Sequence, residues 1–128
     1  MSADVQQITA RLREGYDIFE YCCNQNDPDR MVREFFTSEA MFGATGIALA
    51  RGTREIRPIV GGLSDAVDRV GIRIIEVRVD DSGKLAYALV DVDILLPDGQ
   101  RRVDRALCVW RETPTGWRVD ADWAVLGE

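Results

Sequence analysis

Apolar and polar residues alternate through the second half of the chain, and this pattern predicts four strands joined by short turns. The first two strands are expected over residues 72–79 and 85–96. The pair Asp98-Gly99 predicts a two-residue hairpin, because glycine accepts the positive φ that such turns require. Folding the chain there places Asp93 opposite Asp104 and Asp91 opposite Ala106.

A second turn over residues 113–116 brings Trp110 across from Val119 and Cys108 across from Ala121. One face of the predicted sheet is then mainly aromatic and apolar, with acids among its members: Tyr87, Leu89, Asp91, Asp93, Asp104, Cys108, Trp110, Trp117, Val119, Trp123 and Val125. The other face is apolar as well and includes Val90, Val92, Val103, Leu107 and Val109, with Arg105, Asp120 and Asp122 interspersed. Neither face suits free exposure to water.

The first half predicts helices and two short strands. Apolar residues recur every three or four positions from Ile8 to Cys23, which is one stripe of an amphipathic helix that ends near Asn24. Asp27 and Pro28 predict the cap and first turn of a second helix, reaching to about residue 39. Short strands are expected over residues 40–45 and 47–51, and a third helix over residues 53–67.

Helices followed by a long strand meander predict an α+β fold in which three N-terminal helices cover the concave face of a curved, cone-shaped antiparallel sheet. The chain of 128 residues is expected to form one domain, residues 1–128. It has no apolar run long enough to span a membrane, and its first residues lack a signal-peptide pattern, so a cytoplasmic protein is expected.

Composition narrows the chemistry. The net charge of -6 argues against nucleic acid or an anionic membrane as partner. The chain has no histidine, which removes the commonest general base and metal ligand. Three cysteines without metal-ligand spacing fit a reducing compartment, and we expect neither a metal nor a cofactor.

Three segments carry a resemblance to a known superfamily: NDPDRMVREFFTSEAMF, ARGTREI and CVWRETPTGWRVDADW. Together they resemble the nuclear-transport-factor-two-like superfamily, and more closely its SnoaL-like and ketosteroid-isomerase-like members. The resemblance covers nearly the whole chain and implies the cone fold. It is weak for activity, because many reactions are hosted on this fold.

The resemblance also implies where catalytic residues would lie. The three positions used by ketosteroid isomerases hold Phe19, Ala44 and Cys108 here, and none of these side chains can do that chemistry. The dehydratase relatives use an aspartate and a histidine, whereas this chain offers Asn24 and no histidine. The Asp-Arg-Asp set of the epoxide-hydrolase relatives is matched only loosely.

A relocated catalytic set is therefore predicted from the register. Arg73 is expected opposite Asp91, where it would keep that carboxylate charged. Asp93 and Asp104, directly opposed, would not both ionise cheaply, so they could serve as acid and base. The structural alternative is that these residues lie at a wet rim and only keep it soluble.

A second set is predicted to contact a ligand: Tyr16, Phe19, Tyr87, Cys108, Trp110 and Trp123. The alternative is that these side chains simply fill the core. The function expected is a small domain that binds a hydrophobic small molecule and catalyses proton transfer, dehydration or hydrolysis, with a non-catalytic binding or dimerisation module as the alternative. The second apolar face predicts a homodimer.

Overall fold

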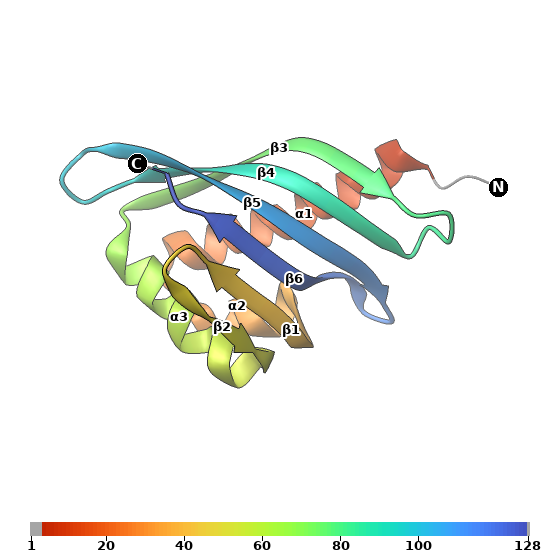
Figure 1. Cartoon of the computed structure of the whole chain (residues 1–128), viewed down its shortest axis with the longest axis horizontal. Helices are drawn as coiled ribbons and strands as arrows, with labels where there is room; N and C mark the ends of the chain where they lie inside the picture. Colours follow the sequence, from red (N-terminus) through yellow and green to blue (C-terminus); the bar gives the residue numbers. More distant parts are fainter. Residues whose placement is uncertain (1–3, 128) are drawn as a thin grey trace.

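Three helices cover one side of the sheet in the computed structural model, which describes residues 4–127 (Figure 1). Helix α1 spans Val5–Asn24, and the side chain of Asp4 caps it by accepting from the amide of Gln7. Helix α2 spans Pro28–Glu34 with Asp27 as its cap, and α3 spans Gly52–Ala66. The predicted apolar stripe of α1 is buried, including Leu12, Tyr16, Phe19 and Cys23. None of the helices within residues 4–127 is long and apolar enough to cross a membrane.

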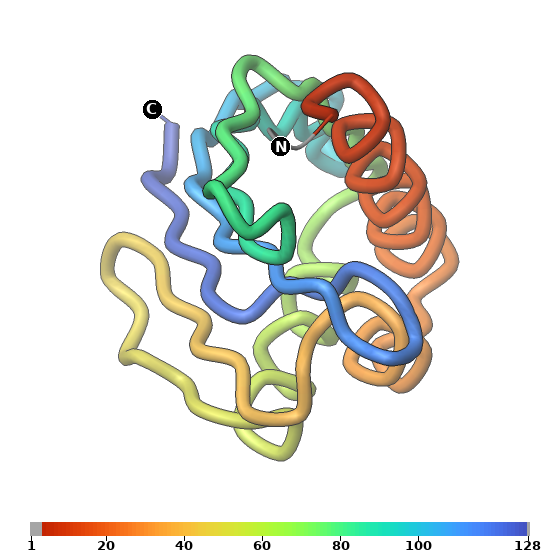
Figure 2. Tube along the Cα trace, turned by 90° about the vertical axis from the view of Figure 1, so that its right-hand side faces the viewer, coloured from red at the N-terminus to blue at the C-terminus, as the bar shows by residue number. Residues whose placement is uncertain are grey.

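Six strands form one sheet in the order β2-β1-β6-β5-β4-β3. Their bounds are β1 Phe36–Ala44, β2 Ile47–Arg51, β3 Arg69–Val79, β4 Leu85–Leu95, β5 Arg101–Thr113 and β6 Gly116–Val125. All neighbours are antiparallel except β1 and β6, which run parallel, so the sheet is mixed rather than wholly antiparallel. Figure 2 looks along the strands and shows the sheet curling around one side, with α1 on the opposite side.

The second helix is shorter than predicted. It ends at Glu34, and β1 begins at Phe36, whereas the sequence pattern placed residues 35–39 on the helix. The amide of Val119 in β6 donates to the carbonyl of Phe35 at 2.8 Å, so pairing with β6 takes over where the helix stops. Both Phe35 and Phe36 are buried, as their apolar character required.

The predicted hairpin register between β4 and β5 is wrong by one position. Asp93 lies opposite Val103, and Asp104 lies opposite Val92. The amide of Leu96 donates to the carbonyl of Gln100 at 2.8 Å, which closes a three-residue loop around Pro97, and Gly99 adopts φ 89°. Proline has no N–H to pair across a ladder, so it joins the turn and the register shifts with it.

The register between β5 and β6 also shifts, at a bulge. Trp110 does face Val119 as predicted, but beyond the irregularity Cys108 faces Asp122 instead of Ala121. A bulge adds one residue to one strand and thereby reverses the direction of the side chains that follow. Asp122, which the sequence pattern placed on the outer face, is therefore turned inward.

These two register shifts change which side chains lie on each face of the sheet. The concave face carries Ala86, Ala88, Val90, Val92, Ile94, Asp104, Ala106, Cys108, Trp110, Val119 and Asp122. The outer face carries Tyr87, Leu89, Asp91, Asp93, Val103, Arg105, Leu107 and Trp123. Six residues that were predicted to face inward are thus on the opposite side of the sheet: Tyr87, Leu89, Asp91, Asp93, Trp123 and Val125.

An aromatic cluster fills one end of the cone. The rings of Tyr16, Phe35 and Trp110 contact one another with centroids 5.0 to 5.8 Å apart, mostly edge to face. Phe19 and Phe36 extend the cluster on either side of Phe35. All five of these aromatic side chains are buried, so this end of the cone is filled.

Candidate functional site

A cavity of about 300 Å³ lies at the other end of the cone, between the concave face, α1 and α3. Its walls are almost entirely apolar: Phe19, Phe42, Ala44, Ile47, Ile59, Gly62, Leu63, Val92, Ile94, Ala106, Ala124 and Leu126. Three polar side chains join them, Arg102, Asp104 and Asp122. An apolar hollow with few polar groups is the usual form of a small-molecule site.

Asp122 is the chemically unusual member of this set. Its residue is only 9% exposed, and burial raises the pKa of its carboxyl to about 7. A hydrogen bond with the Cys108 thiol opposes that rise, but its effect is smaller than that of burial. A carboxyl with a pKa near neutrality is present in both protonation states at pH 7, so it can accept or donate a proton.

A chain of hydrogen bonds supports Asp122 from the core. The indole of Trp110 donates to the hydroxyl of Tyr16 at 3.2 Å, and Tyr16 in turn contacts the Cys108 thiol. Indole nitrogen can only donate, so the Tyr16 hydroxyl accepts from it and is free to donate to Cys108. The Cys108 S–H is then left to donate to the Asp122 carboxylate.

Burial raises the pKa of both Tyr16 and Cys108 well above their ordinary values, so both remain protonated at neutral pH. Among these hydrogen-bonded side chains, Asp122 is consequently the one that ionises in the physiological pH range. These residues support the site from behind: of the predicted ligand contacts, only Phe19 lines the cavity directly.

Arg102 and Asp104 form a second polar feature. The guanidinium donates to both carboxylate oxygens, at 2.8 and 3.0 Å, and the amide of Gly127 donates to Oδ1 at 2.7 Å. Asp104 is four residues from Cys108 along β5, about 13 Å by strand geometry. Since Cys108 faces Asp122, the two acids sit toward opposite ends of the apolar hollow.

The predicted acid pair does not form. Asp93 and Asp104 lie on opposite faces of the sheet, because of the hairpin register, and Asp93 is exposed. The predicted pairing of Arg73 with Asp91 is present at 2.6 Å, but on the outer face, where Arg105 also contacts Asp91 at 2.9 Å. Hydrogen bonds from Arg105 and Arg73 hold the pKa of Asp91 below its usual range, which makes it a poor proton donor.

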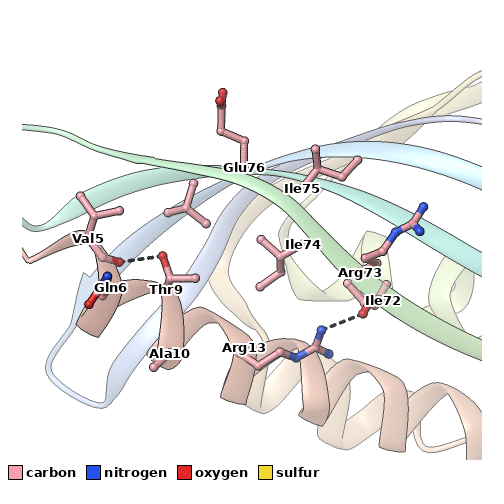
Figure 3. A pocket seen from close by; sticks show the side chains of 11 residues that line it. Val5, Gln6, Thr9, Ala10, Arg13, Ile72, Arg73, Ile74, Ile75 and Glu76 are labelled. Atoms are coloured by element: carbon pink, nitrogen blue, oxygen red, sulfur yellow. Dashed lines mark hydrogen bonds between the residues drawn. The ribbon is translucent and has the colours of Figure 1, made fainter.

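A larger hollow, of about 690 Å³, lies between the first half of α1 and the edge strand β3 (Figure 3). Ile74 points into it, whereas Glu76 points away. Two of its polar side chains are already engaged, since Arg13 donates to the carbonyl of Ile72 at 2.7 Å and Thr9 to that of Val5 at 2.6 Å.

Side chains of α1 also cover the neighbouring part of that edge. Asn24 bonds both the amide and the carbonyl of Val70, at 2.8 and 3.1 Å, and Glu20 accepts from the amide of Ile72 at 2.5 Å. An uncovered edge strand invites pairing with another chain, and these contacts prevent it there. Asn24, which the resemblance placed at a catalytic position of dehydratases, thus binds the backbone of the edge strand.

Similarity to known proteins shows the fold but no specific function or ligand. No protein-family model matches the sequence, and no curated protein matches it either. Among solved structures, a protein of Streptomyces avermitilis described as a candidate dehydratase of the NTF2-like family is similar with a TM-score of 0.76 and 16% identity, over 96% of this chain and 98% of that one.

Two more solved structures agree. A ketosteroid isomerase-like protein of Erwinia carotovora atroseptica has a TM-score of 0.75 and 17% identity, over 91% of this chain and 94% of that one. An NTF2-like superfamily protein of Salmonella enterica serovar Typhimurium has a TM-score of 0.75 and 19% identity, over 98% and 94%. The chain therefore has the α+β cone fold of NTF2-like and ketosteroid isomerase-like proteins.

Proposed function

We propose that the protein binds a small hydrophobic molecule in the 300 Å³ cavity and that Asp122 exchanges a proton with it. The observation that carries the proposal is a buried carboxyl with a pKa of about 7 in an otherwise apolar wall. The reaction class is proton transfer, with dehydration or hydrolysis as the steps that such a transfer would serve. Arg102 and Asp104 would orient a polar group at the other end of the ligand.

Asp122 is suited to this role on both sides of the reaction. As a carboxylate in an apolar surrounding it is poorly solvated, so it is a stronger base than an exposed aspartate. Once protonated, it is a neutral acid whose proton leaves easily at neutral pH. Neither step requires a metal or a cofactor.

The test uses deuterium exchange. Hydrophobic ketones that displace a bound fluorescent dye would be incubated with the protein in D₂O, and exchange at the carbons next to the carbonyl followed by NMR. We expect the substitution Asp122→Asn to leave ketone binding intact and to slow exchange by about 100-fold or more, the usual contribution of a general base. Asp93→Asn, an exposed acid on the outer face, is the control and should change nothing.

The alternative is a non-catalytic binding module, favoured by the presence of Phe19, Ala44 and Cys108 at the positions that the isomerase resemblance makes catalytic. If ketones bind but exchange no faster than in buffer, this alternative holds. In that case Asp122 would only make ligand affinity depend on pH.

We further propose that two copies associate through the outer sheet face. Its exposed large apolar side chains include Tyr87 at 43%, Leu107 at 47% and Trp123 at 49% exposure. A patch of this kind on a sheet is unusual for a monomer. Asp93 and Arg105, both exposed on this face, would pair reciprocally across a two-fold axis.

A further inference from the structure

Three arginines converge on a second hollow, of about 320 Å³, where the end of β5 and the starts of β1 and β6 meet the end of α2. Arg33 comes from the last turn of α2, Arg111 from β5 and Arg118 from β6. This hollow shares no lining residue with the cavity inside the cone. In a chain with a net charge of -6, a gathering of three cations is unexpected from composition.

The arrangement places like charges together. Arg111 and Arg118 are directly opposite each other on neighbouring antiparallel strands, a pairing that normally destabilises a sheet. The hollow is lined by no acidic side chain within the described part of the chain. The nearest compensation is Asp120, whose carboxylate is 3.6 Å from the Arg111 guanidinium and already accepts from Thr37 at 2.7 Å.

One of the three cations is held in place by the backbone. Arg118 donates to the carbonyl of Glu34 at the end of α2 and approaches Thr115 Oγ1 at 3.3 Å. Arg33 has only a loose contact of 3.7 Å with Glu34, whose carboxylate is taken at 2.6 Å by Arg30. Arg33 and Arg111 therefore keep most of their donors available, with side chains 68% and 51% exposed.

Hydroxyl groups complete the lining. Thr37, Ser38, Thr113 and Thr115 all border the hollow. Thr37 and Thr113 already donate, to Asp120 and to the carbonyl of Gly116, so Ser38 and Thr115 are the hydroxyls that can donate to a ligand. Guanidinium groups together with hydroxyls form the donor set that suits a phosphate group, because guanidinium binds two oxygens at once and a hydroxyl can donate to a third. A dianion placed between Arg111 and Arg118 would also remove their mutual repulsion.

From this arrangement we propose a binding site for the phosphate group of a small phosphate monoester, held by Arg33, Arg111 and Arg118. The phosphate lies between the side chains of Arg111 and Arg118, which come from neighbouring strands, and its organic part extends outward over the surface of the sheet. The site is separate from the proton-transfer cavity, so it stands whether or not that cavity is catalytic.

The probes are inorganic phosphate and phenyl phosphate, titrated into ¹⁵N-labelled protein at constant ionic strength. We expect amide shifts confined to the ends of α2 and β5 and the starts of β1 and β6, and tighter binding of phenyl phosphate than of phenyl sulfate, which carries one charge less. Arg33→Gln or Arg111→Gln should each weaken binding about threefold, and the double substitution about tenfold.

Arg78→Gln is the matched control, because Arg78 is 64% exposed with a single loose carboxylate contact of 3.4 Å to Glu76 and does not line this hollow. Equal affinities for the wild type and the double variant would overturn the proposal, as would shifts that sodium chloride reproduces or equal affinity for phenyl sulfate. Should Arg111→Gln perturb the sheet, Arg33→Gln decides alone, since Arg33 lies on an exposed helix turn.

Discussion

Replacing Asp122 by asparagine should make the protein more stable at neutral and alkaline pH. The pKa of this carboxyl is about 7 in the folded chain, against an ordinary value of 3.8. Between those two values the folded state holds a proton that the unfolded state has released, so stability falls as pH rises through this range. Above pH 7 the folded protein carries a buried charge that it would be more stable without.

The size of the effect follows from the two pKa values. Each pH unit between them is worth about 1.4 kcal/mol, so the difference between 3.8 and about 7 amounts to about 4 kcal/mol at pH 8. The asparagine carbonyl oxygen still accepts from the Cys108 thiol, so the supporting hydrogen bond is kept. For a chain of this size, 4 kcal/mol corresponds to a rise in melting temperature on the order of 10 °C.

Urea unfolding at several pH values between 5 and 8 measures this directly. The window isolates Asp122, because the chain has no histidine. Asp91 has its pKa lowered and affects stability only in acid, while the pKa values of the cysteines are raised beyond this range. Parallel curves of unfolding free energy for the wild type and Asp122→Asn would refute the reasoning; Asp93→Asn should give a curve parallel to that of the wild type.

Two further predictions concern the outer face. Leu107→Glu places a charge in the centre of the exposed apolar surface and should turn a dimer into a monomer in analytical ultracentrifugation. The control is Tyr21→Glu, on α1, which should not change the oligomeric state. A wild type that is already monomeric at micromolar concentration would refute the dimer proposal. Gly43→Ala would force a methyl group into the Trp123 ring and should lower the free energy of unfolding in urea by about 1–3 kcal/mol. Gly71→Ala is the control, because open space surrounds Gly71 and the stability of this variant should not change. Equal urea midpoints for the two variants would contradict this packing.

Sequence patterns predicted the elements well because each depends on local periodicity. The apolar stripe of α1 and the cap and proline at the start of α2 placed those helices correctly. Strand alternation likewise identified β3 to β6. The predicted pairing of Arg73 with Asp91 is present although the turn differs by one residue from the expected one: Val79 faces Ala86 rather than Leu85, and a shift between Ile74 and Glu76 restores the predicted register.

The sequence did not predict the cavity residues Asp122 and Arg102, because one hairpin loop and one bulge change the strand register. A two-residue loop at Asp98-Gly99 and a three-residue loop that includes Pro97 differ by one residue, and that residue exchanges the two faces. The bulge at Asp120, which lies between the pairs Val109–Ala121 and Trp110–Val119, leaves no mark in the sequence that we can identify. The inward position of Asp122 can therefore be recognised only from the observed register of the strands.

The presence of an acid at position 122 argues for a role beyond folding. A bulge is a device that redirects a side chain, and here it directs a carboxyl into an apolar hollow. Its hydrogen-bond partner within the core is a thiol, a weak donor that does not offset the loss of water. Leucine or valine at this position would continue the apolar wall of the cavity and would avoid about 4 kcal/mol of destabilisation at pH 8. A sequence under selection for stability alone has no reason to keep an acid there, whereas a site that must take up and release a proton at neutral pH needs one.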